Sequence, residues 1–88
     1  MTTRHTVLDF DDPVEIREFI KNTESGLYSG KNVDNQDVIV ELDKRYGMNV
    51  WTLQKNNWWV IHKYAKDGYL VSESFQRKTP EVKNRIRE

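Results

Sequence analysis

Residues 48–75 read MNVWTLQKNNWWVIHKYAKDGYLVSESF, and this stretch decides the fold. It divides into three runs that are rich in β-branched and aromatic residues, 48–54, 58–64 and 69–75. Such runs suit the pleated, half-buried surface of a sheet. The linkers between them read KNN and AKDG, and both Asn and the Asp-Gly pair favour tight turns. The stretch therefore predicts two consecutive β-hairpins, which form a three-stranded antiparallel meander.

An amphipathic helix is predicted at 13–23, before the meander. Asp12 suits the N-cap, Pro13 suits the first helical position, and Glu15 stands three residues after the cap. Apolar residues recur at helical spacing and give the helix one apolar stripe, formed by Ile16, Phe19, Ile20 and Thr23. This stripe is expected to cover one face of the sheet.

The region between helix and meander holds one loop and one ambiguous run. Residues 24–37 are rich in Gly, Ser, Asn and Asp, so we expect a structured loop, in which Leu27 and Tyr28 could form a brief strand. Residues 38–42 read VIVEL and fit a strand, or a helix that ends near Gly47. Successive β-branched residues lose side-chain freedom in a helix, so we predict a fourth strand.

The two ends of the chain complete the predicted fold. Residues 6–10 fit an edge strand or an extended lead-in, while Thr79 and Pro80 begin a short C-terminal helix. At 88 residues the chain is expected to form a single small domain. The predicted fold class is α+β: an N-terminal amphipathic helix packed on a three- or four-stranded antiparallel β-meander, followed by the short C-terminal helix.

The length of the KNN turn determines which residues share a face of the sheet. If the turn has two central residues, one face carries Trp51, Leu53, Trp58, Val60, His62, Tyr64, Tyr69, Val71, Glu73 and Phe75. That face is apolar enough to form the core. The other face then holds Met48, Val50, Thr52, Trp59, Ile61, Lys63, Leu70, Ser72 and Ser74. A three-residue turn would move Trp51 and Leu53 to the other face, and the sequence leaves this alternative open.

Composition limits the classes of function. The chain has no cysteine, which excludes a disulfide framework, a thiolate zinc site and a cysteine nucleophile. We expect a cytoplasmic protein without a membrane partner, because no run approaches the ~20 apolar residues of a membrane span. The formal net charge is zero, but residues 1–43 carry four Lys/Arg against ten Asp/Glu, and residues 44–88 carry ten against four. A net −6 half thus precedes a net +6 half.

Catalytic and cofactor motifs are not evident. His62 and Glu73 fall opposite each other in the expected register, which fits a polar cross-strand pair better than an acid–base site. The loop GLYSG at 26–30 lacks the Lys-Ser/Thr ending of a phosphate-binding loop. We therefore expect a non-catalytic protein with no cofactor and no metal.

The best-supported function is protein binding. The face opposite the core would expose apolar residues in a polar surrounding, as interface hot spots do. The predicted partner-binding residues are Trp59, Ile61, Val50, Lys63 and Leu70. Another protein is the expected partner, and a weak homodimer is possible.

Single-stranded nucleic acid is the alternative partner. Bases stack on exposed aromatic rings beside cations, and the basic half of the chain contributes both. The cations predicted to contact DNA or RNA are Lys55, Lys63, Lys66, Arg77 and Lys78.

Overall fold

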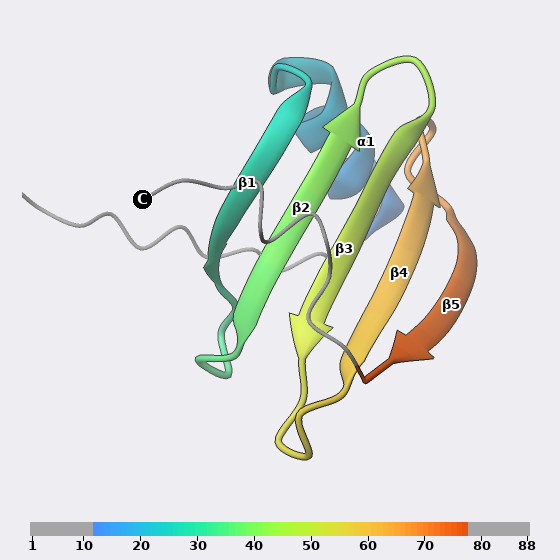
Figure 1. Cartoon of the computed structure of the whole chain (residues 1–88). Helices are drawn as coiled ribbons and strands as arrows, with labels where there is room; N and C mark the ends of the chain where they lie inside the picture. The colour runs from blue at the N-terminus through green and yellow to red at the C-terminus, as the bar shows by residue number, and fades with distance from the viewer. Residues whose placement is uncertain (1–11, 78–88) are drawn as a thin grey trace, which may run out of the picture.

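The computed structural model describes residues 12–77 (Figure 1). Its elements follow in the order α1 (Pro13–Asn22), β1 (Gly26–Lys31), β2 (Asp37–Asp43), β3 (Gly47–Leu53), β4 (Trp59–Ala65) and β5 (Leu70–Gln76). The strands form one antiparallel sheet in which each strand pairs with its neighbour in sequence. α1 lies against one face of this sheet, behind it in the view of Figure 1.

The predicted helix is confirmed, and so is its cap. The backbone N–H of Val14 donates to Asp12 Oδ1 at 2.8 Å, and Pro13 takes the first helical position. Ile16 and Ile20 are the buried residues of the helix, each 3% exposed. None of the helical segments between residues 12 and 77 has the length and apolar character needed to cross a membrane.

The predicted number of strands is too small. The described residues contain five strands and one helix, a mostly β arrangement, where three or four strands were expected. Residues 38–42 do form a strand, as predicted, within β2. The missed strand is β1, which was predicted to be a loop. The predicted C-terminal helix and the strand at 6–10 lie outside the described residues.

β1 forms because of tertiary contacts that its turn-rich composition does not reveal. Tyr28 lies opposite Val40 of β2 and packs against the core under α1. Its hydroxyl also donates to the carbonyl oxygen of Glu24. Pairing along β2 satisfies those backbone groups of GLYSGK that face it, and this outweighs the weak strand propensity of Gly and Ser.

The turn between β3 and β4 has three central residues, so the predicted faces are partly wrong. Gln54 N–H donates to the Trp58 carbonyl at 2.7 Å, and Asn57 takes a positive φ of 70°. This register sets Trp51 opposite Ile61. Trp51 and Leu53 therefore lie on the face away from α1 instead of beneath it, and Met48 and Val50 occupy the core position in their place.

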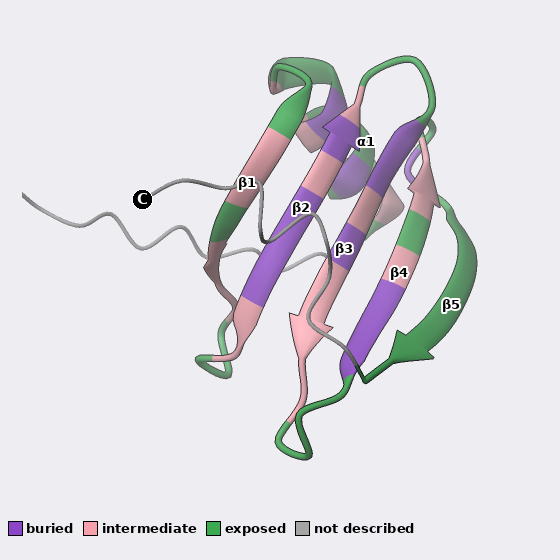
Figure 2. Cartoon of the chain, in the orientation of Figure 1, coloured by how far each residue is buried: buried purple, intermediate pink, exposed green. Residues whose placement is uncertain are grey.

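Two apolar clusters hold the sheet, one on each face. Most of the buried residues of the sheet lie in the central strands (Figure 2). Under α1, buried residues of α1, β2 and β3 pack together: Ile16, Ile20, Val38, Val40, Leu42, Met48 and Val50. On the opposite face a second cluster is built on the buried residues Ile39 and Trp59, against which Leu27, Trp51 and Leu53 pack. The central strands thus carry apolar residues on both faces, which explains the nearly continuous apolar sequence of β2.

The turn between β4 and β5 contacts the first turn of α1. Gly68 has a φ of 95°, and a Cβ at this position would lie 2.0 Å from the carbonyl oxygen of Pro13. Asp67 Oδ1 accepts from the Tyr69 N–H at 3.2 Å and closes the turn. Gly68 is therefore the residue that lets the helix start and the hairpin end meet, backbone to backbone.

Candidate interaction surface

Strand β5 is the most exposed strand of the sheet. All seven of its residues are exposed, and Figure 2 shows it exposed from end to end. Its large apolar side chains include Leu70 at 54%, Val71 at 60% and Phe75 at 58% exposure. We call these three residues the β5 strip. Apolar residues of this size at one strand are unusual on a surface that carries no partner.

A β-bulge places the strip on a single face. Leu70 lies opposite Tyr64 and Ser72 opposite Lys63, so Val71 is the extra residue between them. His62 lies opposite the core residue Val50 and therefore on the α1 face of the sheet. Val60, two positions from His62, shares that face, and so does Phe75 opposite it. Alternation from Phe75 back to Val71 then directs the strip toward the face on which α1 packs.

The helix covers the centre of that face and leaves β5 uncovered. Ile16 and Ile20 pack on residues of β2 and β3, with Tyr28 and Tyr64 at the borders. In Figure 1, α1 lies behind the central strands, while β5 curves away at the edge. The apolar side chains of β5 therefore lie beyond the helix, on the same face.

The outer backbone edge of β5 faces no other strand within residues 12–77. β5 has one neighbour among the described strands, β4, so its outer N–H and C=O groups are not part of the described sheet ladder. Exposed edges are normally blocked by Lys, Pro, inward-pointing charges, very short strands or β-bulges, and the bulge of β5 is confined to Val71 near its start. β5 has neither Lys nor Pro, and its single charged residue, Glu73, accepts a 2.8 Å hydrogen bond from His62 Nε2. The predicted His62–Glu73 pair is thereby confirmed.

The opposite edge of the sheet is different. β1 reads GLYSGK, with two glycines and no apolar side chain beyond Leu27 and Tyr28, both partly buried. It ends at Lys31, whose Nζ lies 2.7 Å from Asp37 Oδ1. A Lys is one of the common devices that discourage edge pairing, and the two glycines leave β1 with few side chains on which a partner could pack. The two edges are therefore unequal, and β5 is the one suited to binding.

An aromatic hollow adjoins the β5 strip at the end of the β3–β4 turn. Trp58 is 37% exposed, and the Arg77 guanidinium carbon lies 5.7 Å from its ring centroid. The hollow measures about 500 Å³ and is lined by Gln36, Gln54, Lys55, Asn56, Trp58 and Phe75. Because Phe75 belongs to both features, strip and hollow form one continuous surface.

The residues predicted to bind a partner do not lie together. Val50 is 5% exposed under α1. Trp59 and Ile61 lie on the other face, where they are 2% and 8% exposed, so they offer a partner little surface. Lys63 is exposed on that same face and Leu70 is exposed on β5. Of the five residues, only Leu70 belongs to the surface described above.

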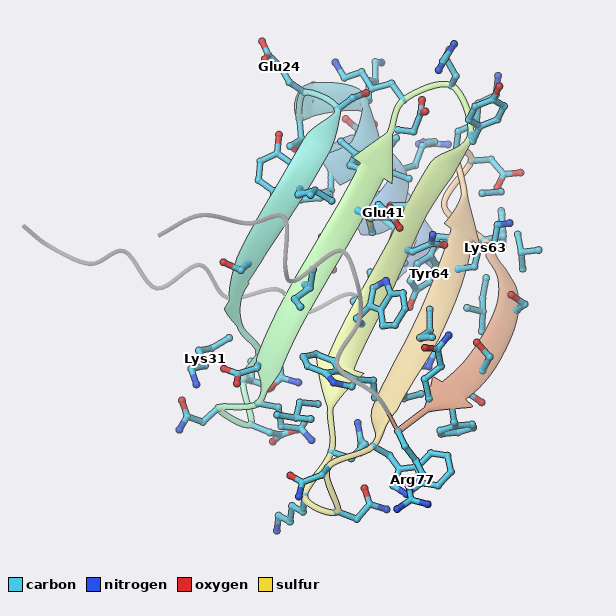
Figure 3. The ribbon with its side chains drawn as sticks, in the orientation of Figure 1. Glu24, Lys31, Glu41, Lys63, Tyr64 and Arg77 are labelled. Carbon is cyan, nitrogen blue, oxygen red and sulfur yellow. The ribbon has the colours of Figure 1, made fainter. Side chains whose placement is uncertain are left out.

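The cations predicted to contact nucleic acid are also dispersed. Lys55 and Arg77 lie beside Trp58, whereas Lys63 lies toward the other end of β4 (Figure 3). Lys66 lies in a separate hollow together with Arg17, Lys21 and Lys44. Lys78 lies outside the described residues. A single strand could therefore meet Lys55 and Arg77 at one site, but not all of these cations along one groove.

Within residues 12–77 the titratable side chains form no metal-binding cluster, and one carboxylate has a lowered pKa. No group of three or more His, Asp or Glu side chains within residues 12–77 could hold a metal ion. The pKa of Asp43 is lowered by hydrogen bonds from the backbone N–H and then the side chain of Arg45, in the β2–β3 turn. This carboxylate caps its own turn and lies apart from the β5 surface.

Sequence reasoning missed the β5 strip because it divided Leu70 and Val71 between the two faces. The bulge at Val71 brings them to one face, and a bulge leaves no reliable mark in a single sequence. The absence of Lys and Pro from 70–76 was the signal that could have found the open edge. Comparison of the chain with protein-family models, curated proteins and solved structures gave no match. Function is therefore inferred from the surface alone.

Proposed function

We propose that this domain is a protein-interaction module that binds an extended segment of a partner along β5. The observation that carries the proposal is that β5 combines a backbone edge unpaired among the described strands with three apolar side chains at 54–60% exposure. Strand addition uses both: the backbone edge gives affinity, and alternate side chains give selectivity.

The aromatic hollow supports the same reading. Trp and Arg are the residue types most enriched among interface hot spots, and Trp58 with Arg77 lies at the end of the strip. A partner segment that follows β5 toward Gln76 would reach this hollow after passing Phe75. We therefore expect an apolar or aromatic side chain of the partner to fill the hollow.

Selection from a library of random ten-residue peptides tests the proposal. Enriched sequences should alternate apolar and polar residues, because alternate side chains of an added strand face the strip. Val71→Lys should weaken their binding by at least about 30-fold, which corresponds to a hot-spot loss of ~2 kcal/mol. Titration of the peptides against wild-type and variant proteins measures this effect.

A matched control is available in the β1–β2 turn. Val33 is 65% exposed, close to the 60% of Val71, so Val33→Lys makes the same chemical change away from β5. It should leave peptide binding within about twofold of wild type. Selected peptides that bind Val71→Lys as well as wild type would contradict the proposal.

One observation favours single-stranded nucleic acid as a second candidate. Trp58 and Phe75 are exposed rings in a hollow that also contains Lys55, with Arg77 close to Trp58. Stacking of a base on Trp58 would quench its fluorescence, and each base–aromatic contact is worth ~1–3 kcal/mol.

Titration with mixed oligonucleotides distinguishes the two candidates. Nucleic-acid binding predicts saturable quenching with a steep salt dependence, which Lys55→Gln and Arg77→Gln reduce and Lys66→Gln does not. Protein binding predicts only weak, sequence-independent quenching that disappears at physiological salt, because a +6 half attracts polyanions non-specifically.

A further inference from the structure

We infer that the segment which adds to β5 is β5 of a second copy of this chain, paired antiparallel about a twofold axis at Glu73. The inference rests on the proposed function, because it names the partner of the same strand. Antiparallel addition of identical edges would join two five-stranded sheets into one continuous sheet.

The sequence of β5 is self-complementary in its chemistry. Residues 71–75 read VSESF, which is an apolar residue, Ser, Glu, Ser and an apolar residue. Pairing about Glu73 sets Val71 opposite Phe75 of the partner subunit and Ser72 opposite Ser74 of the partner subunit. The twofold axis repeats both pairs, so each favourable contact is made twice.

The geometry of the sheet is compatible with this pairing. An axis perpendicular to the sheet keeps the two α1 helices on the same side. The strips of both copies then lie on one face, since β5 directs Val71 and Phe75 to the face of α1. Aromatic and β-branched side chains directly opposite each other are among the stabilising cross-strand pairs. The exposed Val71 and Phe75 side chains of one copy would thus pack beside those of the other.

The zero net charge of the chain permits self-association, and the difference between its two sheet edges directs the contact to β5. The formal net charge of the chain is zero, so two copies do not repel each other as wholes. β1 carries the blocking features described above, so pairing is limited to β5 with β5. A pair of equal edges closes after two copies and does not continue into a fibre.

One contact at the axis opposes the dimer. The two Glu73 side chains meet there, and like charges directly opposite each other are destabilising. Each carboxylate also accepts the hydrogen bond from His62 of its own chain, 2.8 Å away. This pairing register predicts the effect of Glu73→Gln. The substitution removes the repulsion and should lower the dissociation constant of the dimer by about three- to tenfold.

An isotope-filtered NMR experiment tests the register directly. Val71 and Phe75 are four residues apart in one strand, a separation of about 13 Å, which is beyond the reach of a nuclear Overhauser contact within a chain. A mixture of labelled and unlabelled protein should show contacts between the Val71 methyl groups and the Phe75 ring. Their absence in a sample that sediments as a dimer would overturn the inference.

Sedimentation velocity over a range of protein concentrations supplies the second readout. Val71→Lys should weaken self-association by about tenfold or more, since two cross-strand pairs are lost, and Val33→Lys should leave it unchanged. A chain that stays monomeric up to millimolar concentration would refute the second copy. Retained peptide binding in that case would leave the proposed function standing, whereas loss of both would refute both.

Discussion

Trp59→Ala is expected to lower the free energy of unfolding by about 3–5 kcal/mol, the usual cost of truncating a buried aromatic residue. Trp59 is 2% exposed and forms, with Ile39, the centre of the apolar cluster on the face away from α1. Truncation removes the ring and leaves a cavity in this cluster, beside Leu53 of the paired strand β3. Since domains are stable by only ~5–15 kcal/mol, such a loss is a large share of the total. Denaturant titration followed by far-ultraviolet circular dichroism measures it.

The adjacent residue is the matched control. Trp58→Ala deletes the same side chain one position earlier, but Trp58 is 37% exposed beside Arg77. Its cost should stay near 1 kcal/mol or below, as at other surface positions. Equal effects of the two substitutions would show that the register between β3 and β4 is not the one described.

Gly68→Ala is the second substitution with a large expected effect. Its Cβ would collide with the Pro13 carbonyl oxygen at 2.0 Å, and the φ of 95° is unfavourable for alanine. Backbone strain and overpacking each cost ~1–3 kcal/mol, which gives a loss of roughly 2–6 kcal/mol. Because the collision is between the Cβ, whose position the backbone fixes, and a backbone carbonyl group, no side-chain rotation relieves it. The same denaturant titration measures the effect.

Gly26→Ala is the control that separates the steric clash from the cost of placing alanine at a positive φ. Gly26 also has a positive φ, 158°, but a Cβ there meets nothing closer than the Tyr28 hydroxyl oxygen at 3.8 Å. Its cost should be about 1 kcal/mol. If Gly68→Ala were equally mild, the close approach between α1 and the β4–β5 turn would be refuted.

Capping residues and strand propensity predicted the elements whose intrinsic preference matches the structure they adopt. Asp12 and Pro13 mark the start of α1, and the β-branched run in β2 favours a strand. β1 could not be predicted, because what makes GLYSGK a strand is its pairing with β2 and the packing of Tyr28, which are distant in the sequence. A sheet interior can impose strand structure on residues of low intrinsic propensity.

The contact surface was harder to predict than the fold, because it depends on turn length. One additional residue at Asn57 moves Trp51 to the other face, and the side chains of β3 are then redistributed. The bulge at Val71 has a similar effect on β5. Sequence indicated that aromatic and apolar residues exceed what a single face can bury, but not that β5 would carry the excess.

The neighbour-to-neighbour order of the strands also determines how the chain is assembled in time. Every described strand pairs with the strand next to it in sequence, so forming the sheet requires only short loops to close. Sheets of this topology have low contact order for β proteins and belong to the faster folders of that class. Growth from the central β2–β3 hairpin would add β5 last, since β5 buries the least surface. β5 would then also be the first strand to detach during partial unfolding, and the proposed pairing with a second strand would slow that detachment.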